Sequence, residues 1–381
     1  MNNSDYIYFD VASTTPVNSV VLDKMHEINK NYFGNSSSIH QIGQKAHNLI
    51  ERSRKNIASL LGCLESEIIF TSGGTESNNM ALRGILSHND HFITSTYEHP
   101  SILNVAKSVE KKGVEVTYIK PNKHGIIEID DIKNAIKKNT KLISIMFLNN
   151  ELGSINPIEE ISLLCNHKSI SFHTDAVQYI GKGNINLENS TIDLLSLGAH
   201  KFYGPKGIGA LYIKKGIDLS PVIFGGGQEN GYRPGTESVS LIAGMCEALK
   251  IAFKNLDKNK SHIKHLESLF FHELDQTNIS YTLNGGERMD GFLNITFHEV
   301  DGQALLMNLD MNGIAVSFGS ACSSGSAKAS NALLEIGLDK KSAKETIRIS
   351  IGDFITEENI LSIIKSINEI ISKEIKEKQY V

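Results

Sequence analysis

Lys201 is the residue in this chain best suited to covalent chemistry. It stands in His200-Lys-Phe-Tyr-Gly-Pro-Lys-Gly207, a segment separated by two residues from the apolar run 194–197. The run predicts a buried strand, and a lysine at the end of a buried strand is costly to keep charged. Desolvation lowers the pKa of such an amine, and the neutral amine is the nucleophile that Schiff-base chemistry requires. Lys201 is therefore the first candidate catalytic residue.

Two polar side chains lie at the end of another predicted strand, upstream of Lys201. Asp175 ends the strand that the apolar run 170–172 begins, and Gln178 follows three residues later. A carboxylate at the carboxyl end of a parallel strand points into the crevice where open α/β sheets bind ligands. There Asp175 can keep a pyridinium nitrogen protonated, so that the ring accepts electrons. A helix N-cap is the alternative role for Asp175, but its pairing with Lys201 favours the cofactor role.

A glycine-rich turn, Ser72-Gly-Gly-Thr-Glu-Ser77, joins a predicted strand to a predicted helix. Free backbone N–H groups and the helix dipole make such a turn an anion site, and glycine lets phosphate approach the backbone closely. A plain connection with Thr75 as helix cap is the alternative. The turn is not a Walker loop, because no Gly-Lys-Ser/Thr follows. With Lys201 and Asp175, it supplies most of what a pyridoxal phosphate (PLP) site needs.

Three further positions are candidates for binding. His99 follows the run 92–95 and can stack on an aromatic ring, or it is a solvated loop histidine. Asn149 and Asn150 end a strand and can bond a phenolic oxygen or a substrate, or they form a turn. Arg348 lies within a strand pattern and suits a substrate carboxylate held by two hydrogen bonds, or it is exposed on an edge strand.

Cys322 differs from the other cysteines in its surroundings. No large apolar residue lies between Phe318 and Asn331, so the loop has little with which to bury a thiol. We therefore expect a reactive thiol on a mobile loop, which needs a nearby positive charge or base to ionise. The remaining cysteines follow leucines or lie in a predicted helix, and we expect core positions for Cys63, Cys165 and Cys246.

Short apolar runs alternate with helix-like stretches from about residue 67 to residue 213. Continuous β-branched runs predict strands buried on both faces, hence a mostly parallel, seven-stranded sheet flanked by helices. The expected strands are 68–70, 92–94, 116–119, 142–146, 170–172, 194–197 and 208–213. The expected helices are 75–86, 100–111, 130–138 and 157–167, with Pro100 and Pro157 at first helical positions.

The pattern changes after a glycine-rich loop at 225–237. One long helix is expected over 238–276, followed by strands at 281–283, 292–297 and 346–350 and helices near 301–312, 328–336 and 356–377. This mixture predicts a smaller α+β domain. We predict a large domain over residues 14–256, and a small domain formed by residues 1–13 and 257–381 that carries the Cys322 loop.

The bulk composition excludes several classes of protein. The chain has 381 residues, 40% hydrophobic and 21% charged, with a formal net charge of −5. Such a chain has no overall attraction for nucleic acid, no apolar run long enough for a membrane span, and no signal peptide at its N-terminus. Four widely spaced cysteines without a CxxC pair favour reduced thiols in the cytoplasm over a disulfide framework or a zinc site.

Taken together, the motifs resemble those of the NifS/IscS-type cysteine desulfurases, class V aminotransferase-like enzymes of PLP fold type I. The resemblance covers nearly the whole chain, from Tyr8-Phe-Asp-Val-Ala-Ser-Thr-Thr-Pro16 to Arg348-Ile-Ser-Ile-Gly352. The motifs between them include Thr71–Asn79, Glu98-His99, Asn149-Asn-Glu-Leu-Gly153, His200-Lys201, Gly225-Gly-Gly-Gln-Glu229, Arg233-Pro-Gly-Thr236 and Gly319-Ser-Ala-Cys-Ser-Ser324.

The resemblance implies a role for each site residue. Lys201 binds PLP as a Schiff base and shuttles protons, His99 stacks on the ring, and Asp175 pairs with the ring nitrogen. The other implied PLP contacts are Gln178 and Asn150 at the phenolic oxygen, and Gly74, Thr75 and His200 at the phosphate. Thr236 would reach the phosphate from the partner subunit, so the active site is shared across a homodimer.

The resemblance also implies the substrate and the product. Asn35 and Arg348 hold the carboxylate of L-cysteine, and Cys322 takes the sulfur as a persulfide while L-alanine is released. Cys322 then passes the sulfur to an acceptor protein. Iron–sulfur cluster assembly leads among the destinations, and tRNA, cofactor or DNA sulfur modification stay open. No metal ligand is implied with certainty, although Cys322 is a candidate iron–sulfur ligand. The alternatives are a selenocysteine or cystine lyase on the same fold, and an inactive sulfur-pathway scaffold.

Two departures from the family pattern bear on the site. Gly198 lies where the family usually has a phosphate-binding serine, and the loss of one hydroxyl costs about 1 kcal/mol of binding. Asp353 replaces a residue that is often basic, which changes the charge expected near the substrate entrance.

Overall fold

The computed structural model describes residues 6–318 and 329–379, so that Cys322 lies outside the described residues. Its main sheet has seven strands in the order β2-β8-β7-β6-β5-β3-β4. β8 runs antiparallel to β2 and β7, and the other neighbouring pairs are parallel. The predicted mostly parallel, seven-stranded sheet is confirmed. Its strands are β2 (Ile68–Thr71), β3 (His91–Ser95), β4 (Glu115–Ile119), β5 (Thr140–Ser144), β6 (Ser171–Asp175), β7 (Leu194–Gly198) and β8 (Gly209–Ile213).

Continuous burial explains why the strands could be predicted from apolar runs in the sequence. Every residue of β7 and β8 is buried, because helices cover both faces of the sheet. β4 lies at one edge, and only its last residue, Ile119, is buried. The connecting helices are α3 (Gly74–Ile85), α4 (Pro100–Glu110), α5 (Ile129–Ala135) and α6 (Ile158–His167).

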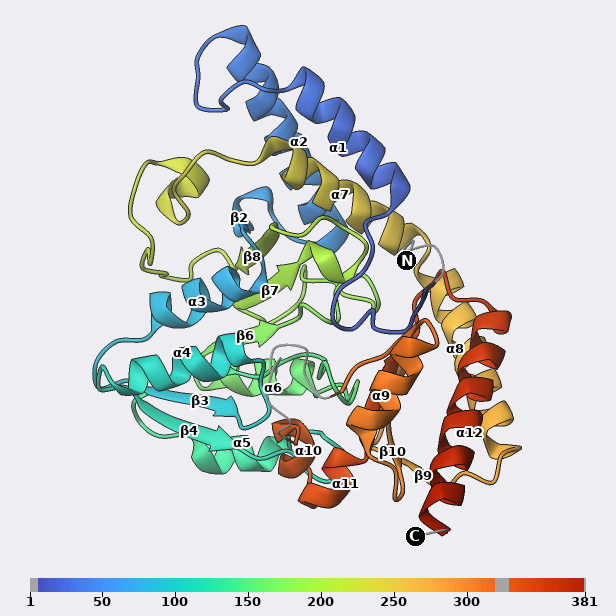
Figure 1. Cartoon of the computed structure of the whole chain (residues 1–381). Helices are drawn as coiled ribbons and strands as arrows, with labels where there is room; N and C mark the ends of the chain where they lie inside the picture. The colour runs from blue at the N-terminus through green and yellow to red at the C-terminus, as the bar shows by residue number, and fades with distance from the viewer. Residues whose placement is uncertain (1–5, 319–328, 380–381) are drawn as a thin grey trace.

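Three helices that flank the sheet come from the segments before its first strand and after its last strand. α7 (Val239–Lys254) packs against α1 (Ser19–Asn31) and α2 (Gln41–Leu61), as the upper part of Figure 1 shows. The sequence analysis did not predict α1 or α2. Pro100 is the first residue of α4 as expected, whereas Pro157 is the N-cap of α6 and the helix begins one residue later.

The single helix expected over 238–276 is wrong. The chain forms α7 and then α8 (Leu256–Asp275), with Asn255 between them at φ −101° and ψ 7°. The Asn255 N–H bonds to the carbonyls of Ile251 and Phe253, which closes α7. Asparagine is a poor helix former because its side chain competes for backbone hydrogen bonds. The apolar pattern continues across the break, so periodicity alone gave no sign of it.

A second, three-stranded sheet has the order β12-β10-β9, with both pairs antiparallel. In Figure 1, α8, α9 and α12 lie beside it. A short parallel pair, β1 with β11, joins the start of the chain to this region. The elements are β1 (Ile7–Tyr8), β9 (Tyr281–Leu283), β10 (Phe292–Phe297), β11 (Ile314–Ala315), β12 (Thr346–Ser350), α9 (Gly302–Met311), α10 (Asn331–Glu335), α11 (Lys340–Lys344) and α12 (Glu357–Gln379).

The small sheet has its own hydrophobic core. Phe9, near the start of the chain, is fully buried in it with Phe270 of α8 and Ile349 of β12. The main sheet packs against separate clusters on its faces. The boundaries predicted at 13/14 and 256/257 stay a prediction. Among the residues described, no helix is both long and apolar enough to cross a bilayer.

Candidate active site

A cavity of about 260 Å³ opens where several strands of the main sheet end. Asp175 is the last residue of β6, Lys201 lies in the 3₁₀ turn after β7, and His99 follows β3. This is the crevice in which open α/β sheets bind ligands. The cavity brings together nine of the predicted site residues: Gly74, Thr75, His99, Asn150, Asp175, Gln178, His200, Lys201 and Arg348.

The other predicted residues are placed differently. Neither Asn35 nor Thr236 lines the cavity in the single chain. Their neighbours Ser36 and Glu237 are hydrogen-bonded at 2.5 Å, so the two segments lie together, beside a separate hollow. The role of Thr236 requires a partner chain, and Cys322 lies outside the described residues. For these three residues the predicted roles stay predictions.

The Lys201 amine is held by the backbone of the N-terminal segment. Its Nζ donates to the carbonyls of Ala12 at 2.6 Å and Ser13 at 2.7 Å. A second lysine, Lys182, lies behind the site and donates to the carbonyls of Gln178 and Lys201, each at 3.0 Å. Burial, together with the charge of Lys201, lowers the pKa of Lys182 to about 7. The sequence analysis missed Lys182, because its polar partners are backbone atoms.

Asp175 ends β6 and is followed by a turn, so the alternative role as a helix N-cap is wrong. Its Oδ1 accepts from the Val177 N–H at 3.0 Å within that turn. Its Oδ2 accepts from Asn78 Nδ2 at 2.7 Å, and Asn78 also donates to Ser101 Oγ at 2.8 Å. The carboxylate is buried yet lines the cavity. Asn78 was missed, although a buried asparagine on a sheet-facing helix is an indication that could have found it.

His99 is not a solvated loop histidine, and that alternative is wrong. It is the N-cap of α4, where its Nδ1 accepts from the Ser101 N–H at 3.2 Å and lies 2.7 Å from Ser101 Oγ. Burial lowers the pKa of His99, the Asp175 carboxylate opposes this shift, and the Lys201 charge adds to it. The imidazole is therefore neutral at physiological pH, which suits a ring that covers another ring.

The start of α3 supplies backbone donors at another side of the cavity. The helix begins at Gly74, and its N-cap is Gly73 at φ 148°, a backbone angle that favours glycine. The first-turn N–H groups of a helix have no partner within it and attract anions. Thr75 is therefore not the cap that the alternative reading proposed. Nearby, burial and the charge of Lys201 lower the pKa of His200 to about 4, so this imidazole is also neutral.

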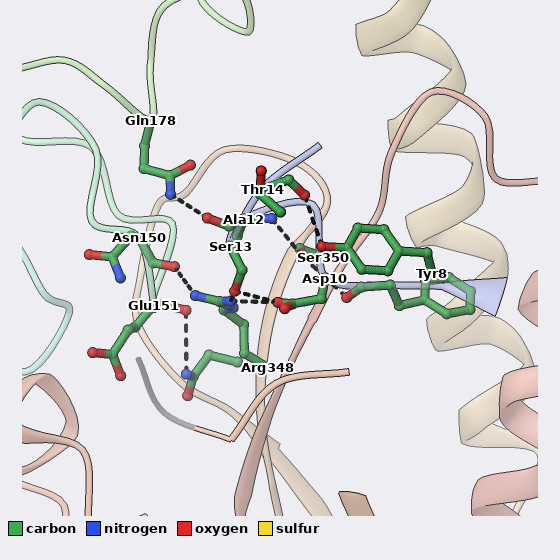
Figure 2. Close-up of polar contacts among 12 residues, drawn as sticks. Tyr8, Asp10, Ala12, Ser13, Thr14, Asn150, Glu151, Gln178, Arg348 and Ser350 are labelled. Atoms are coloured by element: carbon green, nitrogen blue, oxygen red, sulfur yellow. Dashed lines mark hydrogen bonds and ion pairs between the residues drawn. The ribbon is translucent and has the colours of Figure 1, made fainter. Parts of the chain in front are cut away.

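Arg348 is buried rather than exposed, with 1% of its surface accessible. Its Nη2 donates to Asp10 Oδ1 at 2.6 Å and to Ser13 Oγ at 2.7 Å, and its Nη1 donates to the Asn150 carbonyl at 2.8 Å (Figure 2). β12 is an edge strand of the small sheet, but the N-terminal segment covers this side chain. Asp10 and Ser13 were not predicted as site residues.

The three described cysteines are poor nucleophiles. Cys165 and Cys246 are buried, as predicted, and Cys63 is half-buried. Burial raises the pKa of Cys63 and of Cys165 to about 12, and it also raises the pKa of Cys246. At neutral pH almost none of these thiols is ionised, and the thiolate is the reactive form.

The residues around the cavity fit PLP. The start of α3 offers N–H groups to a phosphate, and the Asp175 carboxylate offers a partner to a protonated ring nitrogen. His99, which follows β3, lines the same cavity, and Lys201 supplies the amine. Two buried amide oxygens, Asn78 Oδ1 and Gln178 Oε1, have no hydrogen-bond partner among the described residues. Buried polar groups without a protein partner are typical of a cavity that binds a ligand.

Comparisons with known proteins agree with this geometry. The family model described as aminotransferase class-V matches residues 7–363. The cysteine desulfurase IscS of Dictyoglomus turgidum is 42% identical over 96% of this chain and 95% of its own. A solved NifS-like protein superposes with a TM-score of 0.90 at 34% identity, over 96% of this chain and 99% of its own. A structure of SspA in complex with cysteine superposes with a TM-score of 0.81 at 37% identity, over 92% and 99%.

Proposed function

The chain belongs to the class-V aminotransferase family and, within it, to the cysteine desulfurases, and on this premise we propose how its own residues convert L-cysteine to L-alanine and a protein-bound persulfide. The single observation that carries the proposal is the convergence of Lys201, Asp175, His99 and Arg348 on one cavity. These residues come from both sheets, so only the folded chain assembles them.

PLP is the cofactor that these residues would hold. Bound there, it supplies an electron sink that makes bonds at the substrate's α- and β-carbons breakable. Gly74, Thr75 and His200 would contact its phosphate, and Asn150 and Gln178 its phenolic oxygen. Asp175 supports the assignment of the ring nitrogen, because a buried carboxylate stabilises a proton placed beside it.

Lys201 is the residue that carries protons in this proposal. Two backbone carbonyls orient its amine toward the cavity, and the lysine behind it has a lowered pKa, so the region does not favour extra positive charge. His99 stays neutral and covers the ring without competing for protons. Arg348 and Asn35 would bind the substrate carboxylate, Arg348 from within the cavity and Asn35 from the loop before α2.

Cys322 is the proposed sulfur acceptor. The other thiols are buried or half-buried with raised pKa values, so none of them can attack sulfur efficiently at neutral pH. In the net reaction the substrate C–S bond breaks with its electron pair left on carbon, and an S–S bond forms to Cys322. A proton then completes the methyl group of L-alanine. The persulfide would next transfer its outer sulfur to an acceptor protein, for which iron–sulfur cluster assembly remains the predicted destination.

A homodimer with a shared site is part of the proposal. The segments that carry Asn35 and Thr236 are bonded to each other through Ser36 and Glu237 but do not line the cavity of their own chain. A second copy of the chain would bring Thr236 to the phosphate. The predicted cytoplasmic location stays a prediction.

Mass spectrometry of the intact PLP-loaded protein after incubation with L-cysteine tests this function. We expect wild type to gain one sulfur atom that a reductant removes, and to release L-alanine. Cys322→Ala should gain none, whereas the matched control Cys63→Ala should behave like wild type. Sulfur gain in Cys322→Ala, or none in wild type that holds PLP on Lys201, would contradict the proposed function.

A further inference from the structure

Asp10 forms a buried ion pair with the arginine that the proposal assigns to the substrate. Asp10 Oδ1 accepts from Arg348 Nη2 at 2.6 Å, and the same oxygen accepts from Ser13 Oγ at 2.9 Å. The Arg348 side chain is 1% exposed and that of Asp10 is 18% exposed. Figure 2 shows the three side chains facing one another below the turn at Ala12. The charge of Arg348 is thus already compensated by the protein itself.

The hydrogen-bond geometry limits what a second carboxylate can do. A guanidinium offers two edges for a fork of two parallel N–H bonds, one formed by Nε with Nη2 and one by Nη1 with Nη2. Each edge requires a hydrogen of Nη2. In Arg348 both Nη2 hydrogens donate, one to Asp10 and one to Ser13. Nη1 also donates to the Asn150 carbonyl, and the buried Nε is the nitrogen without a partner among the described residues.

We propose that Asp10 is a specificity-determining residue that competes with the substrate carboxylate for Nη2 of Arg348. A ligand gains the fork only when it displaces Asp10 or Ser13 from that nitrogen. An amino acid held also through its amino group has further contacts to offset the displacement, whereas a simple anion has none. Asp10 therefore excludes simple carboxylates from the site. The inference rests on the proposed function for the identity of the substrate.

The surroundings of the pair support competition. Burial raises the pKa of the neighbouring Glu151 carboxyl, and the hydrogen bond from Ser330 and then the Arg348 charge partly oppose this shift. Burial and the Asp10 charge raise the pKa of the Tyr8 hydroxyl to about 12, so Tyr8 stays neutral. No described cation other than Arg348 bonds to Asp10. A second carboxylate at Arg348 therefore meets the negative charge of Asp10 beside the guanidinium.

Asp10→Asn tests the competition with the smallest change of shape. The asparagine oxygen still accepts from Nη2, but a neutral acceptor is roughly half as strong as a charged one, and its repulsion of a carboxylate is gone. At a separation of about 4–6 Å in a partly buried site, this repulsion corresponds to a tenfold or larger change in affinity. We expect the Kd of the PLP-loaded dimer for L-alanine, measured by calorimetry, to fall about tenfold in Asp10→Asn.

The control ligand is L-alaninamide, which lacks the carboxylate. Its Kd should stay within about twofold of wild type, since it does not compete for Nη2. Acetate, compared with chloride at equal ionic strength, should become a competitive inhibitor of L-alanine binding in Asp10→Asn but not in wild type. An unchanged or higher Kd for L-alanine would overturn the inference, because Asp10 would then orient Arg348 rather than compete. Equal shifts for both ligands would also overturn it, as a general structural effect.

Two further variants protect the test. Asp10→Glu keeps the charge and should restore a Kd near that of wild type. Ser13→Ala frees one Nη2 hydrogen without changing any charge, so a smaller fall in the Kd for L-alanine is expected even if Asp10→Asn does not fold. The binding assay needs no sulfur transfer. If wild type released no alanine from cysteine but the Kd for L-alanine still fell in Asp10→Asn, the proposed function would fail and the inference would stand. If wild type released alanine but the Kd did not fall in Asp10→Asn, the inference would fail and the proposed function would stand.

Discussion

Gly198 gives the sharpest test of how this site holds its cofactor, because a single side chain can be added there. Gly198 ends β7 at φ −138° and ψ 125°, an extended conformation that any residue adopts. A Cβ at this position would lie 3.5 Å from the Gly74 nitrogen and 3.6 Å from His200 Cδ2 and Val177 Cγ1. These are ordinary contact distances, so a serine fits without displacing its neighbours. Its hydroxyl would lie beside the start of α3, where the phosphate is proposed to bind.

A serine at position 198 should have two separable effects, one on the stability of the fold and one on the affinity for PLP. Replacing glycine in a compatible extended conformation stabilises the fold by about 0.4–1 kcal/mol, because the unfolded chain loses freedom. Gly198→Ala should show this part alone. The hydroxyl adds one hydrogen bond to the phosphate, worth about 1 kcal/mol, which corresponds to a roughly fivefold lower Kd for PLP. Gly198→Ser should show both parts.

Two measurements separate the parts. Urea unfolding of the PLP-free protein should give Gly198→Ala and Gly198→Ser equal stabilities, both above wild type. The PLP dissociation rate during dialysis should be slowed only in Gly198→Ser. Equal PLP retention in the serine and alanine variants would refute the placement of the phosphate beside Gly198. Destabilisation by alanine would instead show that the end of β7 has no room for a side chain.

Two other predictions concern the buried charges. Burial lowers the pKa of Lys182 from an ordinary value of 10.5 to about 7 in the folded protein, so the unfolded chain binds one more proton between these two pH values. The free energy of unfolding therefore rises with pH in this range, by up to about 1.4 kcal/mol per pH unit. Lys182→Met should reduce this rise in urea unfolding at pH 7.5 and 9.0, and an equal rise in wild type and variant would contradict the prediction. Arg54 donates to Glu229 at 2.7 Å and 2.8 Å within the protein, so Arg54→Ala should cost about 3–5 kcal/mol of unfolding free energy; Lys133→Ala, which breaks the exposed pair with Asp130, should cost less than about 1 kcal/mol in the same assay, and similar losses would refute the comparison.

The strands of the main sheet could be predicted because each is an apolar run that ends at a turn. The predicted runs and the observed strands coincide within a few residues, from Ile68–Thr71 to Gly209–Ile213. The break at Asn255 could not be predicted in this way. Its apolar neighbours continue the helical period, and the break shows only in the backbone angles of Asn255 and in the packing of α8 on α12.

The site residues likewise fall into those that the local sequence predicts and those that it does not. Lys201, Asp175 and His99 were found because each stands at the end of a strand, and strand ends of a parallel sheet converge. Asn78 and Asp10 were missed because their partners are distant in the chain: Asn78 bonds to Asp175 across 97 residues and Arg348 to Asp10 across 338. A local pattern carries no trace of such a contact. The residues that do chemistry were thus easier to find than those that position them.

The N-terminal segment 10–14 contacts both Lys201 and Arg348. Its carbonyls bind the Lys201 amine after β7, and its Asp10 and Ser13 side chains bind Arg348 on β12. The Ala12 carbonyl also accepts from Gln178 Nε2 at 2.6 Å, and the Ala12 N–H donates to Ser350 Oγ at 3.0 Å. The separation between the amine and the guanidinium is therefore set by one short segment, through its carbonyls at Lys201 and its side chains at Arg348. Because Phe9 anchors this segment in the core of the small sheet, we expect a substitution in that core to shift Asp10 and Ser13 relative to Lys201.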